Sequence, residues 1–207
     1  MSSNASRADS TRERLIAVAR ELFTSHGYQE TSVQEVIDRS GVSRGALYHH
    51  FHSKQALFEA VLEEVERELA DAIIRTSADA TTSGAALRAG SAAFLEAAND
   101  PAIRQIVLID APNAVGWSRW RAIDARYGFG LLKAAFQNEA NEGRLPPELV
   151  DDYAHILLAA LLELGLQIAN APDTARAQQK AQHAIDTLLA RLVTADDRDA
   201  PSAASSI

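Results

Sequence analysis

Apolar residues recur every three or four positions over most of the chain, which is the spacing of amphipathic helices. Ser10-Thr11-Arg12-Glu13 has the pattern of a capping box at the start of the first stripe, and Gly27 can end it. The stripe consists of Leu15, Ile16, Ala19, Leu22 and Phe23. The sequence therefore predicts a first helix between these two signals. The small, polar residues 1–9 and 195–207 are predicted to form disordered tails.

Residues 31–54 follow with the pattern of two short helices joined by a tight turn. Gly41 can end the first of them and Ser43 can cap the second. In the second helix, Leu47 and Phe51 lie four residues apart and face inward. The residues left to face outward are Ser43, Arg44, Gly45, Tyr48 and His49.

A helix of about two turns cannot be stable alone, so its neighbours must brace it. Its outward polar and aromatic side chains suit contact with a partner. This arrangement is typical of a helix-turn-helix, in which one helix supports another that enters the major groove of DNA. Gly45 removes side-chain bulk where the backbone can approach a base pair, and Lys54 at the positive start of the next helix suits a phosphate.

From Ser53 an apolar stripe continues to about Thr76, which predicts one long helix joining two domains. The stripe consists of Leu57, Val61, Val65, Leu69 and Ile73, broadened by Phe58 and Leu62. We expect a DNA-binding domain over residues 10–54 and a larger helical domain for ligand binding and dimerisation over residues 55–194. A shift at the far end of this helix would swing the short outward-facing helix, although a plain connecting helix is equally compatible with the pattern.

Helix breaks and aromatic residues gather in the middle of the chain. A helix over residues 84–99 precedes a nearly all-apolar helix over 103–111, which Pro112 ends or kinks. Another helix opens at Trp117 and is expected to continue to Phe136. Such a region can form an apolar pocket with few polar anchors, although aromatics at helical spacing also form ordinary core. Asp110 could instead cap a neighbouring backbone group. The candidate pocket residues are Phe94, Ile106, Asp110, Trp117, Trp120, Tyr127, Phe136 and, from a later helix, Glu163.

The last two predicted helices have the composition of a dimer interface. The first begins near Pro146 and ends at Asn170, and its apolar positions cover more than one face. Asp173 caps the second, and two such helices from each subunit can pack as a four-helix bundle. The candidate interface residues are Tyr153, Leu157, Leu161, Gly165, Ile168, Ile185, Leu188 and Leu192.

Two groups of residues superficially resemble metal sites. Three histidines lie within residues 49–52, but neighbouring helical positions point about 100° apart. His155 and Glu163 share a helix face and are roughly 11–12 Å apart, too far for one ion without other ligands. We therefore expect neither a metal nor a cofactor. The stripe of His155, Glu163 and Gln167 could line the pocket, hydrogen-bond across a dimer or face water.

The charge of the chain is unevenly distributed. The net charge is −8, but residues 1–54 carry seven Lys or Arg against six Asp or Glu, giving +1, while the remainder carries 13 against 22, giving −9. Acidic residues therefore concentrate away from the predicted DNA-binding face, and non-specific affinity for DNA should be weak.

Composition also bounds the location. The chain has no cysteine, which excludes disulfides and thiol chemistry. Its first ten residues lack the apolar core of a signal peptide, and no apolar run approaches the roughly 20 residues needed to span a bilayer. We expect a cytoplasmic protein with no membrane partner.

The first three predicted helices resemble the tetracycline-repressor (TetR) family of bacterial regulators over about residues 11–60. The matching positions are Leu22-Phe23, His26-Gly27-Tyr28, Thr31-Ser32-Val33, Ile37, Gly41-Val42-Ser43, Leu47-Tyr48, Phe51 and Ser53-Lys54. Asp110-Ala-Pro, with the following Gly-Trp and Trp-Arg, is similar to a subgroup of TetR C-terminal domains. The resemblance implies a homodimer with an N-terminal DNA-binding domain and a divergent helical C-terminal domain, where a small molecule binds and usually releases DNA.

The resemblance also implies roles for individual residues. Positions that contact bases or backbone of a double-stranded operator are Ser43, Arg44, Gly45, Tyr48, His49 and His50, and positions that contact phosphates are Thr31 or Ser32 and Lys54. Many members carry a second tyrosine where this chain has His49, which makes that backbone contact weaker or more sensitive to pH.

These observations predict an all-α, ligand-responsive DNA-binding regulator, a repressor that a small apolar effector releases from a palindromic operator. One alternative is a constitutive DNA-binding dimer without an effector, which would not need the aromatic-rich, helix-broken middle. The other is a small helical enzyme. The chain has no Gly-rich phosphate loop, no nucleophile elbow and no carboxylate pair with a supporting histidine, so we expect no enzymatic activity.

Overall fold

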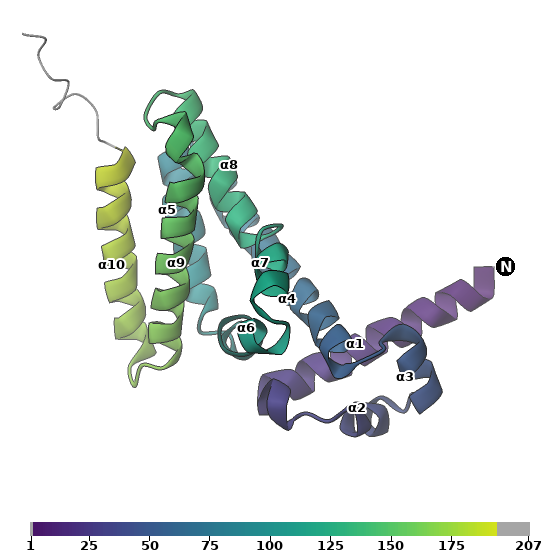
Figure 1. Ribbon diagram of the computed structural model, residues 1–207. Helices are drawn as coiled ribbons and strands as arrows, with labels where there is room; N and C mark the ends of the chain where they lie inside the picture. The colour runs from purple at the N-terminus through teal and green to yellow at the C-terminus, as the bar shows by residue number, and fades with distance from the viewer. Residues whose placement is uncertain (1, 194–207) are drawn as a thin grey trace, which may run out of the picture.

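The computed structural model describes the backbone of residues 2–193, and every regular element in that range is a helix. The all-α prediction is therefore confirmed. In chain order the helices are α1 (Ser2–Glu30), α2 (Val33–Ser40), α3 (Arg44–His50), α4 (Lys54–Ser77), α5 (Ser83–Ala97), η1 (Ile103–Asp110), α6 (Ala111–Ala114), α7 (Trp117–Asp124), α8 (Gly128–Asn141), η2 (Pro147–Leu149), α9 (Val150–Ala169) and α10 (Thr174–Val193) (Figure 1).

The first helix begins earlier than the sequence predicts. Its backbone is helical from Ser2, where residues 1–9 were expected to be disordered and Ser10 to open the helix. No proline or glycine occurs in residues 2–26, so nothing in the sequence breaks a helix there. The helix kinks at Gly27, whose φ of 77° and ψ of 169° are non-helical, as the predicted stop requires. The predicted tail at residues 195–207 lies outside the described residues.

The caps of the next two helices are the ones that the sequence predicts. Ser32 accepts a hydrogen bond from the Glu35 amide at the start of α2, and Gly41 ends that helix in the left-handed conformation, with φ of 65°. Ser43 accepts from the Ala46 amide at the start of α3. Gly41 and Ser43 therefore fix the two ends of the turn between α2 and α3.

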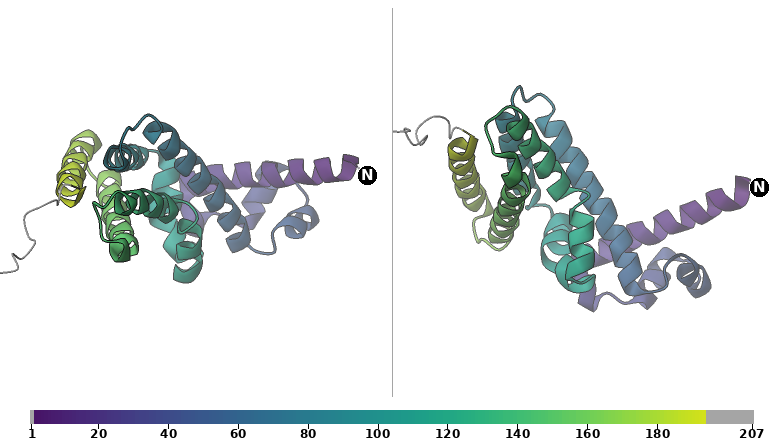
Figure 2. Two further views of the ribbon diagram at one scale, coloured as in Figure 1. Left: turned by 90° about the horizontal axis from the view of Figure 1, so that it is seen from above. Right: turned by 45° about the horizontal axis from the view of Figure 1, so that its top comes forward.

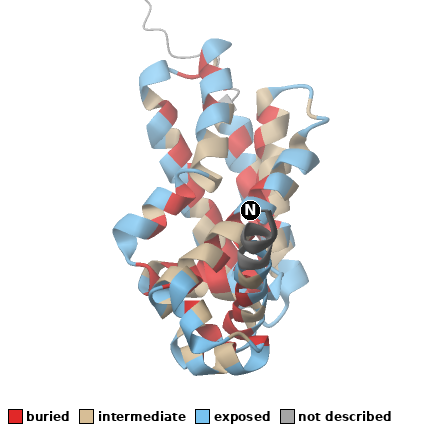
Figure 3. Ribbon diagram, turned by 90° about the vertical axis from the view of Figure 1, so that its right-hand side faces the viewer, coloured by how far each residue is buried: buried red, intermediate tan, exposed pale blue. Residues whose placement is uncertain are grey.

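The long helix α4 connects the two ends of the molecule. It begins at a Ser53 cap and ends at Ser77, within one residue of the predicted end. It packs against both α1 and α5. Buried residues follow its inner side from Leu57 to Ala70, and Figure 3 shows the buried positions gathered on the inner sides of the helices.

The larger helical part is built from α4, α5 and α8 to α10. Helix α5 packs against α4, α8, α9 and α10, so it lies at the centre of this part. The views in Figure 2 agree that α9 and α10 lie on the side away from α1. Helices α1 to α3 and the dimer candidates are therefore at opposite ends of the protein.

Two local departures from the predicted helices shape the middle of the chain. The apolar segment before Pro112 forms η1, a wide π-type helix, because proline lacks an amide hydrogen and its ring would collide with the carbonyl four residues earlier. The helix that opens at Trp117 does not continue to Phe136 as expected. It stops at Asp124, and a new helix starts at Gly128.

Candidate DNA-binding surface and ligand pocket

Helix α3 presents its polar residues to solvent and its apolar residues to the core. Leu47 is fully buried and Phe51 nearly so, as predicted. Tyr48 keeps 45% of its surface exposed. The exposed residues of this outward face are Ser43, Arg44, Gly45, Tyr48 and His49, and His50 is partly buried. This face is available to a partner along its whole length.

Arg44 and His50 are held by neighbours. The Arg44 guanidinium donates to Gln34 Oε1 on α2, and Gln34 Nε2 donates in turn to Asp38 at 2.7 Å. The His50 ring lies against the rings of His49 and Phe51, at centroid distances of 5.3 and 6.4 Å. Helix α2 thus orients the guanidinium of Arg44 while leaving the residue exposed.

Gly45 has no internal reason to be glycine. A Cβ atom at this position would meet nothing within 4 Å, and the residue is helical. Alanine is favoured over glycine inside a helix by roughly 1 kcal/mol. A glycine that the protein itself does not require is consistent with the close approach of an external surface.

Lys54 is engaged inside the protein. Its ammonium donates to the backbone carbonyls of Tyr28, Gln29 and Thr31 at 2.8, 3.3 and 3.1 Å. It also lies 4.3 Å from the centre of the Tyr28 ring. Its three donors are therefore already used at the kinked end of α1, and a role on phosphate stays a prediction.

Thr31 is wrong as a DNA-contacting residue. Its side chain is only 1% exposed, and its hydroxyl donates to the Gly27 carbonyl at 2.8 Å. The hydroxyl completes the end of α1 instead of reaching outward. Ser32 is exposed, and its hydroxyl accepts from the Glu35 amide at 3.1 Å, so of the two alternatives only Ser32 can reach a phosphate.

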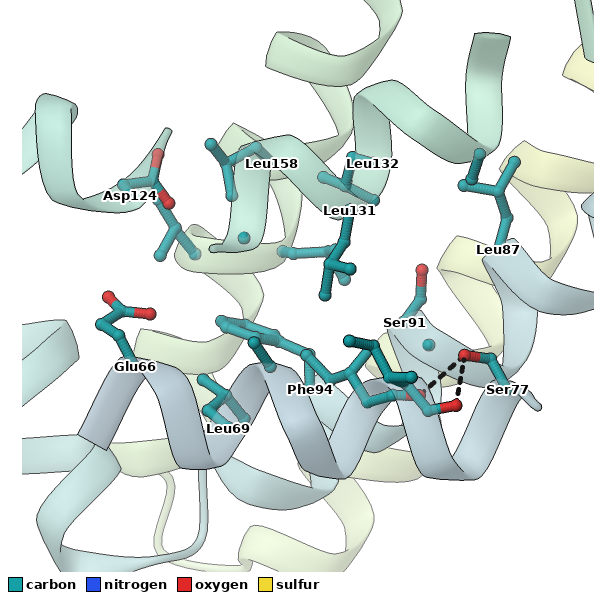
Figure 4. A pocket seen from close by; sticks show the side chains of 18 of the residues that line it. Glu66, Leu69, Ser77, Leu87, Ser91, Phe94, Asp124, Leu131, Leu132 and Leu158 are labelled. Atoms are coloured by element: carbon teal, nitrogen blue, oxygen red, sulfur yellow. Dashed lines mark hydrogen bonds between the residues drawn. The ribbon is translucent and has the colours of Figure 1, made fainter. Parts of the chain in front are cut away.

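A cavity of about 120 Å³ lies inside the larger helical part. It is formed between α4, α5, η1, α7, α8 and α9. Most of its lining is aliphatic, with Phe94 as the one aromatic residue. Figure 4 shows Glu66 and Asp124 at one end, and Ser77, Ser91 and Leu87 toward the other.

Of the eight residues predicted for this pocket, only Phe94 lines it. Ile106 and Phe136 are buried in the core, where Phe136 packs against Tyr153. Trp117 is 68% exposed because Trp120, one helical turn later, takes the inward position. Tyr127 lies in the break between α7 and α8, partly buried against the core.

Asp110 caps a backbone amide, which is the alternative role predicted for it. Its Oδ2 accepts from the Tyr28 amide at 2.7 Å and from Gln105 Nε2 at 3.1 Å. Glu163 is exposed and accepts from Gln167 at 2.9 Å. His155 is also exposed, with its ring 4.2 Å from that of Phe129. The stripe on α9 therefore faces away from the pocket.

The polar residues of the pocket are ones that the sequence prediction missed. Glu66 and Asp124 are each 5% exposed. A signal for Glu66 was present, because it continues the row of Phe58 and Leu62 at four-residue spacing on the apolar side of α4. Asp124 had no such signal. Its burial depends on α8, which begins four residues later, and on α4 and α9, which are distant in sequence.

The environment of these two acids disfavours their charged forms. Burial, and then the nearby Asp124 carboxyl, raises the pKa of Glu66 to about 8. Burial raises the pKa of Asp124 to about 6, against the opposing effects of Arg121 and His155. Arg121 lies 3.1 Å from Asp124, whereas no basic group offsets the burial of Glu66.

Asp110 and Gly27 join the cavity to the DNA-binding end. Helix η1 contributes Val107 to the cavity wall, and one turn later Asp110 holds the Tyr28 amide. A Cβ atom on Gly27 would lie 3.0 Å from Gln105 Nε2, so the two parts meet with no spare room. Displacement of η1 would therefore move or break its contacts with Gly27 and Tyr28, just before the helix-turn-helix.

The residues predicted for a dimer interface are mostly buried inside one subunit. Leu157, Leu161, Gly165, Ile168 and Ile185 are part of the protein's own core, so that assignment is wrong for them. A Cβ atom on Gly165 would contact Phe94 and Leu108, not a second backbone. Tyr153 is partly buried against Phe136. Of the predicted set, Leu188 is exposed and Leu192 partly exposed.

Within residues 2–193, no helix is both long and apolar enough to cross a bilayer. No three His, Asp or Glu side chains there gather in a way that could hold a metal ion.

Comparison with known proteins identifies the chain. Residues 84–192, more than half of it, match the tetracyclin repressor-like C-terminal domain, and residues 15–61 match the bacterial regulatory proteins of the tetR family. The chain belongs to the TetR family. TetR proteins are DNA-binding transcriptional regulators, so the recognised resemblance is confirmed.

Three similar proteins indicate how far this similarity extends. The Transposon Tn10 TetC protein of Escherichia coli is 27% identical over 166 residues, or 80% of this chain and 84% of TetC. The crystal structure of a TetR-family transcriptional regulator from Pectobacterium atrosepticum is 28% identical, covers 91% of this chain and 97% of its own, and has a TM-score of 0.77. FadR of Bacillus subtilis, solved in complex with stearoyl-CoA, is 15% identical, covers 88% of this chain and 97% of its own, and shares the fold with a TM-score of 0.68.

Proposed function

We propose that this TetR-family protein is a cytoplasmic, homodimeric repressor, and that a small, largely apolar effector releases it from a palindromic operator. The observation that carries the DNA-binding part is the outward face of α3. Arg44 and Tyr48 are exposed on a helix whose inner side is anchored by Leu47 and Phe51. A short, braced helix with an exposed polar face suits insertion into a major groove.

The outward face of α3 divides into two kinds of contact. Arg44 has the donors for bidentate contact with a guanine edge, and Gln34 limits the directions in which it can point. Ser43, Tyr48 and His49 are suited to phosphates and base edges, and Ser32 is exposed at the start of α2. With a net charge of only +1 over residues 1–54, a few specific contacts must supply most of the affinity.

The DNA-binding proposal is tested by gel shifts against a genomic operator library at low salt. We expect retarded protein–DNA complexes with a subset of the sequences, and we expect that subset to contain inverted repeats. The spacing between half-sites should be about one helical turn, because two recognition helices must reach successive major grooves. Absence of any retarded species at low salt would show that the regulator proposal is wrong.

The dimer is proposed to form through the outer face of α9 and α10. We define this face by Ile156 and Ala159 on α9 and by Ala184 and Leu188 on α10, all of which are exposed. Ile156 retains 56% of its surface, which is unusual for an isoleucine in a folded protein. The two pairs lie at similar distances from the turn that joins the antiparallel helices. They can therefore form one surface across both.

Light scattering after size exclusion tests this dimer. Ile156→Asp should convert the dimer to monomer, because a carboxylate would be buried without a partner at the interface. Trp117→Asp is the matched control, since it puts the same charge at the most exposed apolar side chain on another helix. A dimeric Ile156→Asp variant would exclude this face.

The effector part of the proposal depends on the cavity and on its link to Tyr28. FadR shares this fold and has been solved with stearoyl-CoA, which supports a ligand role for the helical domain. An effector that binds better when η1 is displaced would weaken operator binding, with a typical coupling of about 1–3 kcal/mol. A constitutive dimer without an effector is the second candidate. A thermal-shift screen with small apolar molecules separates the two, because only an effector pocket gives concentration-dependent stabilisation.

A further inference from the structure

We propose that the cavity binds a mostly apolar molecule that carries a positively charged amine, and that Glu66 and Asp124 receive the amine. This inference rests on the proposed function, since it names the chemical class of the effector. It goes beyond that function by assigning the two buried acids a ligand.

Glu66 lacks the partner that a buried acid needs. It lies on α4 with 5% of its surface exposed, and it makes no hydrogen bond with any residue that the structure describes. Figure 4 shows its carboxyl group directed into the cavity, toward the side occupied by Asp124. Buried polar groups are nearly always hydrogen-bonded, so an unpaired one that faces a cavity indicates a missing partner.

The charges around this end of the cavity favour a cation. Asp124 faces Glu66 from α7. Arg121 and His155 lie near enough to Asp124 to lower its pKa, against the effect of burial. Arg121 is already paired with Asp124 at 3.1 Å, and among the described residues Asp124 is the one charged group that acts on the Glu66 carboxyl. An ammonium group would bring both a counter-charge and several N–H donors to Glu66.

Other head groups fit this end less well. A carboxylate or phosphate would meet two acids and would be repelled by whichever of them is ionised. A neutral hydroxyl has a single donor, so it can satisfy one acid and cannot compensate a charge. The amine is therefore the group that the acidic end selects.

A second, independent observation points to a ligand at the other end. The Ser91 hydroxyl is buried in the cavity wall, and it has no hydrogen-bond partner among the described residues. Figure 4 shows it directed into the cavity, on the side away from Asp124. Between the two ends the wall is formed by Leu69, Phe94 and Leu131. A molecule that spans the cavity would thus have an amine, an apolar body and a polar atom near Ser91.

The test compares three probes with the same apolar body and different head groups. They are 4-phenylbutylamine, 4-phenylbutan-1-ol and 4-phenylbutyrate, titrated into the full-length dimer by calorimetry at pH 7. We expect the amine to bind at least ten-fold more tightly than the alcohol, and the carboxylate to bind more weakly than either. In Glu66→Gln the amine should lose its ten-fold advantage, whereas Glu68→Gln, which removes an exposed acid from the same helix, should retain it.

The protons released on binding provide a second readout. At pH 7 Glu66 is mostly protonated, because its pKa is about 8, so an ammonium that pairs with its carboxylate should displace a proton. Calorimetry in two buffers of different ionisation enthalpy should therefore record release of up to about one proton per site with the amine and less with the alcohol. This difference should disappear in Glu66→Gln.

The outcomes separate the head-group assignment from the regulator function. Equal or weaker binding of the amine relative to the alcohol, or failure of all three probes to bind at 5 mM, overturns the assignment, whatever the protein does on DNA. Tight amine binding that leaves operator gel shifts unchanged supports the assignment and counts against an effector role. Tight amine binding that releases the operator supports both.

Discussion

The recognition helix and the ligand cavity use polar residues in opposite ways. On α3 the polar side chains point outward into solvent. In the cavity Glu66 and Ser91 are buried, and neither makes a side-chain hydrogen bond with a residue that the structure describes. The first arrangement costs the folded protein little. The second lowers the free energy of unfolding, and the proposed amine ligand would recover part of that loss on binding.

The difference also determines how each region can be switched. In the proposed function, exposed groups on α3 set which DNA sequence is preferred, and their contribution appears only in the complex. Buried groups in the cavity affect stability before any ligand is present. The helix η1 lies between the two, with Val107 at the cavity and Asp110 at the Tyr28 amide.

The largest expected effect is that of a cavity residue, Glu66, on the free energy of unfolding. Above pH 4.5 unfolded Glu66 loses its proton, whereas folded Glu66 keeps it until about pH 8, so the free energy of unfolding falls as pH rises across this window. Glu66→Gln removes this loss and should raise the free energy of unfolding at pH 8 by roughly 2–4 kcal/mol. Urea denaturation at pH 5 and pH 8 measures the difference, with Glu68→Gln as the control.

Asp124 should leave a smaller pH dependence in the Glu66→Gln variant. Its pKa is raised from 3.8 to about 6, so stability should still decline between these values as pH rises. A variant whose stability falls as steeply as that of the native protein between pH 6 and 8 would show that Glu66 is not the titrating group.

On the recognition helix the largest effect should come from Arg44. Arg44→Ala should weaken operator binding by about 1–3 kcal/mol and relax the preference at one base pair, because a bidentate base contact is lost. Arg75→Ala removes the same charge at the far end of α4 and should change little. Binding to a randomised operator library, read by sequencing, measures both affinity and preference. Unchanged preference would exclude base reading by Arg44.

The link between the two regions should have an intermediate effect. Asp110→Ala should lower the free energy of unfolding by about 1–2 kcal/mol, because the Tyr28 amide loses a charged acceptor. Hydrogen exchange should accelerate at residues 27–32, where that amide lies. Asp110→Asn keeps an oxygen acceptor and should show a smaller change. Equal exchange in all three proteins would mean that this bond does not hold the two regions together.

The smallest change in stability is expected at Gly45. Gly45→Ala should raise the free energy of unfolding by about 0.5–1 kcal/mol, because alanine favours the helix and its Cβ meets no neighbour. The same methyl group should weaken operator binding if the backbone approaches a base pair closely. Thermal melts and gel shifts on one preparation give both results. A variant that is more stable and binds DNA as well as before would remove the proposed role of Gly45.

The same contrast explains what could be predicted from the sequence. Ser43 and Gly41 act on backbone groups within three or four residues, so their roles can be recognised in a single stretch of sequence. Leu47 and Phe51 likewise follow from helical periodicity. Thr31 was misassigned because its hydroxyl serves the carbonyl of Gly27 at the kink, a geometry that no periodic pattern specifies.

The cavity could not be predicted because its lining comes from helices that are distant in sequence. Trp117 and Trp120 have the same residue type, and only the rotation of α7 places one outside and the other inside. Asp124 becomes a cavity residue because α7 ends there. The sequence predicted one continuous helix across this break. Leu157 and Leu161 are as apolar as an interface requires, yet they are buried in the core of a single subunit. Apolar content alone does not distinguish the two uses.

The tight seat of Gly27 limits how this protein can be combined with others in biosensor engineering. A hybrid that takes its first three helices from a different repressor must also supply a residue without a side chain at position 27, facing Gln105 and Asp110. A donor with alanine there would push against Gln105 and adopt a backbone angle that alanine disfavours. Exchanging η1 together with α1 would keep this joint within one parent, and the crossover points should be chosen accordingly.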